Sequence, residues 1–248
     1  MTLKILSYNI HKGYDWNNKN YFLNEIKELI KDVDADLVFL QEVVGQSNKY
    51  RKYGQLDVQF EFLADSLWSQ FAYAKNAVYD GGHHGNMILS KYPVTNWENL
   101  DISTNFIEKR GLLIVQIEIP NLNNKKIFAA TLHLDVFHRG RKQQYQMIKN
   151  KILSLNLNDQ TPLIIAGDFN DWNKKAAEVL NKELGMEEVY QKKHKTFAKT
   201  FPAGYPFLCL DRVYVKNCKV LDASIWHNSS QRHFSDHLPL FCEVEIAE

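Results

Sequence analysis

Short apolar runs, rich in branched and aromatic residues and bounded by turn formers, recur along the whole chain. Runs of this kind predict β-strands. Eight are expected: LKILSYNI (3–10), DLVFLQEV (36–43), NMILSKYPV (86–94), GLLIVQIEI (111–119), KIFAATLHL (126–134), PLIIAGD (162–168), DRVYV (211–215) and LPLFCEVEI (238–246). Several follow one another with no room for a helix, as between residues 111 and 134, so strict strand–helix alternation is excluded.

Apolar positions at helical spacing predict four helices between some of these strands. The stripes run through 22–30 with Asn20 as a candidate N-cap, 63–67, 144–155, and 174–184 closed by Gly185. Amphipathic helices outside two sheets packed back to back are the natural arrangement for such a pattern. The chain has no internal repeat, low-complexity tract or linker, so residues 1–248 are expected to form one domain.

Polar side chains stand where several apolar runs end. Asn9 follows KILSY, Glu42 follows LVFLQ, His133 interrupts AATLHLD, and Asp168 and Asn170 follow LIIAG. Asp168 and Asn170 alone are compatible with a turn, and His133 alone with a satisfied core histidine. Glu is not a favoured turn residue, so Glu42 indicates either an ion pair with a nearby lysine or a functional role.

Two more polar groups precede their strands, because Asp211 stands before RVYV and the pair Asp236–His237 before LPLFCEVEI. If those strands run antiparallel to the earlier ones, all of these groups gather at one edge of the sheets. Loops over such an edge are where a rigid scaffold presents an active site. The set is rich in oxygen and lacks thiolates, which suits Mg²⁺ or Mn²⁺ better than structural zinc.

The composition narrows the class of protein without indicating a substrate. The 248 residues are 45% hydrophobic and 24% charged with a net charge of +1, so the chain lacks the global basic field of many nucleic-acid binders. Cys209, Cys218 and Cys242 are far apart, which favours neither a disulfide framework nor a paired-thiolate zinc site and indicates a reducing compartment. No secretory leader or membrane-spanning run is apparent, so we expect a cytoplasmic protein without stable membrane insertion.

Eight segments, in order over nearly the whole chain, resemble the endonuclease/exonuclease/phosphatase superfamily, which has the pancreatic deoxyribonuclease-like fold. They are LSYNIHKG, LVFLQEV, GNMILSKYP, KRGLLIVQIEI, ATLHLD, IIAGDFND, LDRVYV and SDHLPL. The combination of QE after a strand, GDFN and a terminal SDH in this order is specific. The variants GHHGN, GDFNDW and TFPA…LDRVYV are closest to a group of small bacterial members.

The resemblance implies an α/β (α+β) fold: a four-layer αββα sandwich of two mixed, mainly antiparallel sheets with helices outside. It also implies metal-dependent hydrolysis of a phosphoester. Glu42 would be the principal ligand of Mg²⁺ or Mn²⁺, helped by Asn9 and Asp236. A cation and fixed donors would offset the repulsion between an anionic ester and an incoming hydroxide.

The resemblance assigns the remaining polar residues to the reaction itself. Asp168 would orient or activate the attacking water, and Asn170 would bind the phosphoryl oxygen on which charge develops. His237 would contact the scissile phosphate, with its ring fixed by a hydrogen bond to Asp211. His133 would flank the phosphate on the opposite side.

Four further residues are candidates for substrate binding: His84 and Asn86 in a glycine-rich loop, Arg110 before GLLIV, and Arg141 in the basic run HRGRKQQ. Each has a simpler alternative. Arg110 is as compatible with a surface ion pair as with phosphate binding, and a basic run is usually a solvated helix start. Trp16 and Trp172 lie beside the polar positions, although buried packing is the commoner role of tryptophan.

We therefore expect a phosphodiesterase of nuclease-like type, with no obligate protein partner. Phosphatase or phospholipase C-like action on lipid headgroups, inositol phosphates or sugar phosphates is the alternative within the enzyme class. The lipid alternative requires exposed apolar loops beside the site, and FPAGYPFL (201–208) is the best candidate. An inactive phosphate-binding module is the alternative of another class, and it expects at least one core position to be lost.

Overall fold

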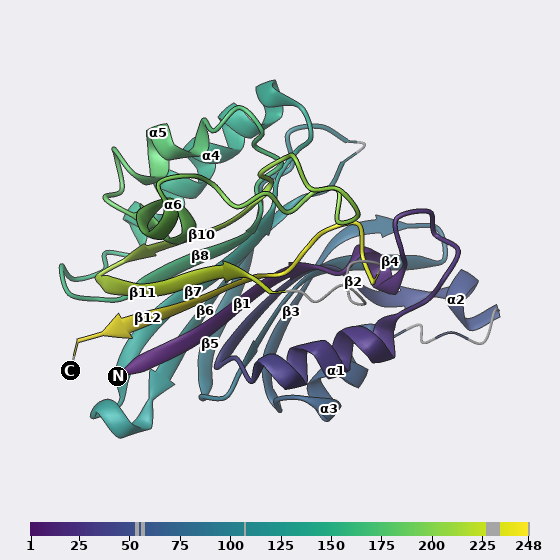
Figure 1. The fold of residues 1–248 in the computed structure, drawn as a ribbon, viewed down its shortest axis with the longest axis horizontal. Coiled ribbons are helices and arrows are strands. Elements are labelled where there is room, and N and C mark those ends of the chain that lie inside the picture. Colours follow the sequence, from purple (N-terminus) through teal and green to yellow (C-terminus); the bar gives the residue numbers. More distant parts are fainter. Residues whose placement is uncertain (53–54, 56–57, 107, 227–233, 248) are drawn as a thin grey trace.

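Two six-stranded sheets form the centre of the computed structural model, which describes residues 1–52, 55, 58–106, 108–226 and 234–247 (Figure 1). The first sheet has the order β11-β12-β1-β2-β4-β3. Its strands are β1 (Thr2–Asn9), β2 (Leu37–Ser47), β3 (Gln70–Tyr79), β4 (Gly82–Ser90), β11 (Cys218–Ile225) and β12 (Leu240–Ile246).

The second sheet has the order β5-β6-β7-β8-β10-β9. Its strands are β5 (Val94–Asp101), β6 (Gly111–Ile119), β7 (Lys125–His133), β8 (Leu163–Asp168), β9 (Glu187–Glu188) and β10 (Asp211–Lys216). One pair in each sheet is parallel, β1 with β2 and β7 with β8, and the other pairs are antiparallel. The expected mixed, mainly antiparallel sheets are thus confirmed.

Helices cover the outer face of each sheet (Figure 1). Beside the first sheet lie α1 (Leu23–Val33) and α3 (Gln59–Ser66), and beside the second lie α4 (His138–Ser154) and α5 (Ala176–Leu180). The shorter elements are α2 (Asn48–Lys52), α6 (Val189–His194) and the 3-10 turns η1 (His11–Gly13) and η2 (Pro120–Leu122). None of the helices in the described ranges is long and apolar enough to cross a bilayer.

Alternating side chains of the central strands pack into different hydrophobic cores. In β6, Leu113 packs between the two sheets, whereas Leu112 and Ile114 pack under α4 and α5. In β1, Ile5 points between the sheets and Leu6 points toward α1. Because both faces of these strands are buried, their sequences read as continuous apolar runs, and the four-layer arrangement follows from that burial.

The four strands that the pattern did not predict, β3, β5, β9 and β11, are the edge strands of the two sheets. Edge strands bury less surface, and six of the eight side chains of β5 are exposed. Their sequences therefore lack the apolar runs that identify the central strands. The eight predicted strands are all present.

Two expectations about helices were wrong. Helix α1 begins after Phe22, which makes no side-chain cap bond, and the amide of Asn20 instead donates to Asp15 at 2.7 Å. The predicted helix 174–184 is helical only over Ala176–Leu180, and the chain then turns irregularly, with two amides bonding to Val179 O before Gly185 at φ 68°.

Candidate active site

Strand register brings the predicted residues together at one edge of both sheets. In the second sheet, Asp168 at the end of β8 pairs with His133 of parallel β7 and with Asp211 of antiparallel β10. In the first sheet, Asn9 at the end of β1 pairs with Gln41 of β2, which places Glu42 beside it. The antiparallel orientation of β10 and β12 that the sequence analysis required is therefore confirmed.

Asn9 joins the two halves of this cluster. Its amide nitrogen lies 3.1 Å from Asp168 Oδ2 in the second sheet and 3.4 Å from Glu42 Oε1 in the first. Its own Oδ1 accepts a hydrogen bond from the backbone of His11 at 3.1 Å. One buried amide thus holds two carboxylates from different sheets within a short distance of each other.

Glu42 projects toward this cluster because β2 bulges at this point. The register between β2 and β4 shifts between Leu40 and Val43, and Glu42 has a φ of 58°. A bulge and a left-handed residue re-aim a side chain that regular pleating would place elsewhere. Although burial raises the pKa of Glu42, the ammonium of Lys12 hydrogen-bonded to it and nearby His133 hold that pKa well below its usual value.

Asp168 lies at the centre of the site and is almost fully buried. Its Oδ1 accepts a hydrogen bond from the backbone of Asn170 at 2.9 Å. Its Oδ2 lies 3.4 Å from His133 Nε2 and 3.6 Å from His237 Nε2. Asn170 has a φ of 48°, and its amide donates one hydrogen bond to Leu134 O at 2.9 Å, which leaves the second amide hydrogen for a ligand.

Gly167 makes the approach of β8 to β7 possible. It has a φ of 148°, and a Cβ added there would lie 2.1 Å from Leu132 O. The glycine of the GDFN motif is therefore required by backbone packing next to Asp168 and not by contact with a ligand.

His237 is paired with a buried carboxylate. Its Nδ1 lies 2.9 Å from Asp211 Oδ2, which also accepts a hydrogen bond from the Thr200 hydroxyl. Burial lowers the pKa of His237, but Asp211 and Asp168 outweigh burial and raise that pKa to about 10. The ring therefore carries a positive charge at neutral pH, with Nε2 directed at the same carboxylate oxygen that His133 faces.

His133, by contrast, is neutral although it lies beside two carboxylates. Burial, assisted by Arg110, lowers its pKa to about 3 in spite of Asp168 and Glu42. It has no carboxylate hydrogen-bonded to it as closely as Asp211 is to His237. Asp168 therefore stands between one neutral and one cationic imidazole.

Asp236 belongs to the same end of the molecule but lies farther from the carboxylate pair. Its Oδ1 is 3.8 Å from Nδ1 of His11, whose backbone amide binds Asn9. The preceding residue fixes this segment, because the Ser235 hydroxyl donates to Asn9 O at 2.7 Å and accepts from the His237 amide at 3.2 Å. The SDH segment is thus bonded directly to the end of β1.

A cleft continues from the carboxylates along the β3–β4 hairpin. His84, Asn86, Lys109 and Arg110 line it together with Glu42 and His133. Burial lowers the pKa of His84 to about 4, and its Nδ1 has no hydrogen-bond partner among the described residues. The structure thus places three of the four predicted substrate-binding residues, His84, Asn86 and Arg110, beside the metal and catalytic candidates.

Arg141 is the exception, and the prediction that it binds substrate is contradicted by its surroundings. Its side chain is fully buried, and it donates to Asp135 O at 3.0 Å and Val136 O at 2.6 Å. The guanidinium also stacks 4.4 Å from the Trp172 ring. Arg141 therefore fixes the loops after β7 and β8 from inside.

Sequence reasoning missed Lys12 and Thr200. Lys12 lies in a turn in which His11, Lys12 and Gly13 all have positive φ, and only Gly13 signals such a turn in a sequence. Thr200 reaches Asp211 across the loop before β10. Thr200 follows no apolar run, so the pattern that found the other polar groups could not find it.

The donor set fits a hard divalent cation. Among the residues that the structure describes, no three Asp, Glu, His or Cys side chains form a cluster that could hold a metal without other ligands. Magnesium commonly uses one or two carboxylates and completes its shell with water and phosphate oxygen. Glu42 supplies such a carboxylate. The Lys12 ammonium and the Asn9 amide nitrogen already donate to it, which shows that its oxygens attract positively polarised groups.

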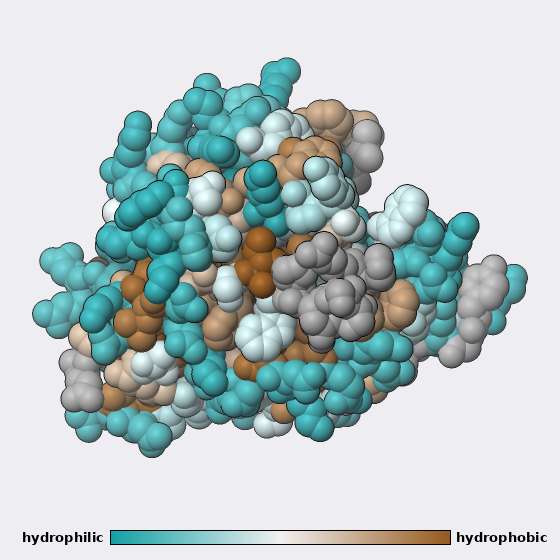
Figure 2. Space-filling view, viewed as in Figure 1, coloured by the Kyte–Doolittle hydropathy of each residue, from teal (hydrophilic) through white to brown (hydrophobic). Residues whose placement is uncertain are grey.

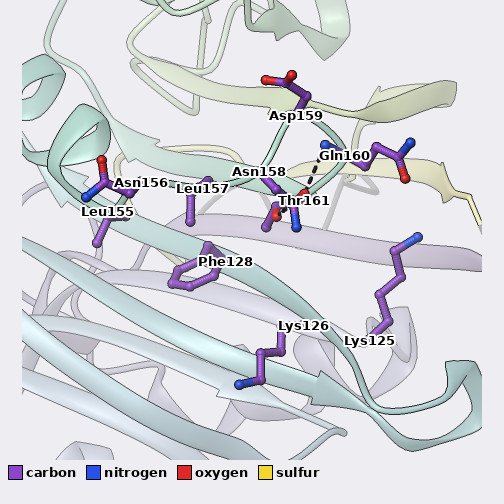
Figure 3. A pocket seen from close by; sticks show the side chains of 10 residues that line it. All are labelled: Lys125, Lys126, Phe128, Leu155, Asn156, Leu157, Asn158, Asp159, Gln160 and Thr161. Atoms are coloured by element: carbon purple, nitrogen blue, oxygen red, sulfur yellow. Dashed lines mark hydrogen bonds between the residues drawn. The ribbon is translucent and has the colours of Figure 1, made fainter.

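A second hollow lies at the opposite edge of the second sheet (Figure 3). It is lined by Lys125, Lys126 and Phe128 at the start of β7 and by residues 155–161, where Asn158 Oδ1 accepts hydrogen bonds from the Gln160 amide and the Thr161 hydroxyl. Its lining includes one carboxylate, Asp159, and no histidine. It lacks the chemistry gathered at the other edge.

Three comparisons place this geometry among known proteins. A profile of the Endonuclease/Exonuclease/phosphatase family matches residues 6–237. "Uncharacterized protein YbhP" of Escherichia coli K12 is 39% identical over 248 residues, 99% of this chain and 97% of its own. An endonuclease/exonuclease/phosphatase structure from Beutenbergia cavernae is similar with a TM-score of 0.82 at 17% identity, over 99% of this chain and 72% of that one. The human Nocturnin catalytic domain with bound sulfate is similar with a TM-score of 0.77 at 16% identity, over 99% and 95%.

Replacing Asp211 with Asn should lower the pKa of His237 well below its wild-type value of about 10, because the hydrogen-bonded carboxylate is lost while burial still disfavours the charged ring. In the wild type, the raised pKa of His237 means that the folded protein binds this proton more tightly than the unfolded chain does. The resulting stabilisation is complete below about pH 6.5 and is lost as the pH rises through about 10. Imidazole NMR shifts against pH measure the change, and Asp65→Asn on the exposed face of α3 is the control. A wild-type ring that titrates near its ordinary pKa would contradict the assignment.

Proposed function

We propose, from the premise that the chain belongs to the endonuclease/exonuclease/phosphatase family of phosphoester hydrolases, that it is a divalent-metal-dependent phosphodiesterase. The observation that carries the proposal is the position of Asp168. Its Oδ2 lies within 3.6 Å of two imidazoles, the neutral ring of His133 and the cationic ring of His237, and within 3.1 Å of the Asn9 amide. Such a carboxylate can accept a proton while neighbouring donors stabilise negative charge.

Asp168 acts as the residue that orients the attacking water and takes its proton. The Asn9 amide and the Asn170 backbone amide fix the carboxylate in one orientation. General-base catalysis of this type contributes about 100- to 10,000-fold in rate. One donor is a side chain of the first sheet and the other is a backbone group of the turn after β8, so the base is positioned before substrate arrives.

His237 supplies a fixed positive charge next to the phosphorus. Asp211 holds its ring at Nδ1, and Thr200 holds Asp211, so Nε2 is directed at Asp168. Asn170 adds an amide donor from the neighbouring turn. Preorganised donors of this kind lower the energy of the transition state because they need no rearrangement when charge develops.

Glu42, Asn9 and Asp236 would hold Mg²⁺ or Mn²⁺, and when bound the cation polarises the phosphoryl oxygen and lowers the repulsion felt by the incoming water. In the structure, Asn9 turns its amide nitrogen toward Glu42 and Asp168. Its Oδ1, the atom that a cation requires, accepts the backbone amide of His11 and keeps a second lone pair for a ligand. Lys12 pairs with Glu42 from the other side.

The residues beyond His133 favour a diester over a monoester. A diester carries a second alcohol substituent, and Arg110 and Lys109 lie beside His133 and Glu42. Both side chains are suited to an anionic group on that substituent. The neutral state of His133 and His84 leaves this part of the site less positive than a site for a doubly charged monoester requires.

Replacing Glu42 with Gln should reduce kcat/KM for a bis-aryl phosphate by about 100- to 1,000-fold and raise the Mg²⁺ concentration needed for half-maximal rate, because a neutral amide attracts the cation less. The rate is measured against Mg²⁺ concentration, with EDTA removing activity in the wild type. Glu61→Gln on the exposed face of α3 is the matched control. Unchanged metal dependence in Glu42→Gln would exclude Glu42 as the ligand.

Replacing Asp168 with Asn should reduce kcat by about 1,000-fold or more while KM changes little, because the amide keeps the shape but cannot accept the proton of the attacking water. Steady-state kinetics on the same bis-aryl phosphate separate the two constants. Near-normal kcat in the variant would show that another group activates the water.

A further inference from the structure

Exposed apolar side chains are concentrated around the site. Eight large apolar side chains of the described residues are more than half exposed, and only Trp97 and Leu153 among them lie away from this edge, on β5 and α4. The other six, here called the apolar rim, lie on the loops and the hairpin that surround the cleft: Trp16, Val78, Phe106, Phe137, Tyr205 and Phe207. Figure 2 shows hydrophobic side chains at the upper right of the molecule, over the loops beside the start of α4.

Hydrogen bonds hold two of these tips in place through one buried carboxylate. Asp135 accepts hydrogen bonds from Thr104 at 2.8 Å and Asn105 at 3.1 Å, in the loop that carries Phe106. It also accepts the backbone amide of Phe137 at 2.7 Å. Phe106 is 86% exposed and Phe137 is 67% exposed, so the fold fixes these two loops while leaving their rings in solvent.

The loops that carry Trp16, Tyr205 and Phe207 are hydrogen-bonded to residues at the edge of the site. Ala203, in the loop that carries Tyr205 and Phe207, donates to Asp236 O at 2.7 Å. Asp15 O, next to Trp16, lies 3.1 Å from His11 Nδ1. Because these loops also position the site, a surface that binds their apolar side chains would lie close to the site.

The exposed charge of these loops is mainly positive although the whole chain has a net charge of only +1. In the loops after β7 and β8, the carboxylates of Asp135 and Asp171 are buried, whereas Lys174 is exposed. Arg139 and Lys142, at the start of α4, are exposed as well. Lys199 is exposed on the loop before β10. Basic side chains next to apolar tips complement a surface that is anionic outside and apolar beneath.

We propose that the apolar rim docks this face of the protein on an anionic lipid bilayer and that the substrate is a phosphodiester in a lipid headgroup. The proposal rests on the proposed function, since it names the substrate class of the same site. In the reaction, water forms a new P–O bond, the P–O bond to one alcohol breaks, and that alcohol leaves with a proton. Docking requires no spanning segment, because side chains at loop tips reach only the boundary between headgroups and acyl chains.

Single-stranded nucleic acid also combines negative charge with apolar surface, but the rim suits it less. Bases stack on aromatic rings that line a groove along the strand. Here Phe106 and Tyr205 are 86% and 82% exposed at the tips of separate loops, and Val78 has no ring to stack. Side chains that project outward in this way fit a broad apolar layer better than a strand lying in the cleft.

Sedimentation with vesicles tests the proposal on the full chain, using phosphatidylcholine alone and phosphatidylcholine mixed with phosphatidylglycerol. The wild type should bind the mixed vesicles, and added salt should weaken the binding. Phe106→Ser with Tyr205→Ser should weaken binding by about tenfold or more, because two rings no longer enter the bilayer boundary. The matched control is Trp97→Ser with Leu153→Ser, two exposed apolar residues away from the rim, which should bind as the wild type does.

Hydrolysis of a soluble bis-aryl phosphate separates this proposal from the proposed function. The rim variant should hydrolyse the soluble diester at the wild-type rate and lose activity only on vesicles. Equal vesicle binding by the rim and control variants, or tight binding of a single-stranded oligonucleotide in place of vesicles, would overturn the docking proposal. Rim-dependent vesicle binding with no hydrolysis of either diester would uphold docking and refute the enzyme assignment.

Discussion

The hydrogen bond from Asn9 to Asp168 is the contact on which the site depends, because it joins the edge of one sheet to the edge of the other. Each sheet alone presents an incomplete set: the first contributes Glu42, and the second contributes Asp168, His133 and Asp211. Packing of the inner faces of the two sheets brings these edges into register. The apolar core between the sheets thus sets the distance between Glu42 and Asp168.

Burial alone would leave both central histidines neutral. Asp211 reverses that outcome at His237, because it is hydrogen-bonded to the ring and is itself held by Thr200. His133 has no such partner and remains neutral. His133 and His237 flank Asp168 but differ in charge, and the difference originates in Asp211 and Thr200 behind His237. Environments that separate the pKa values of two similar groups are common in sites that need distinct acid and base roles.

The sequence identified the central strands and most polar residues of the site because two-faced burial produces apolar runs and the site lies where those runs end. It did not identify the edge strands, such as β5, because their exposed side chains resemble a loop. It also misjudged Arg141, since a buried arginine bonded to backbone carbonyls has the same sequence context as a basic helix start. Lys12 was missed because only Gly13 signals its turn, and Thr200 because it lies in a loop with no apolar run before it.

A crystal soaked with Mn²⁺ and inorganic phosphate tests the central claim most directly. The convergence of both sheets on Asp168 predicts an anomalous peak for manganese beside the carboxylate of Glu42, with phosphate between His133 and His237. The groove at Lys125 and Lys126 (Figure 3) offers positive charge without these partners and should stay empty. Manganese away from Glu42, or phosphate bound only in that groove, would contradict the account.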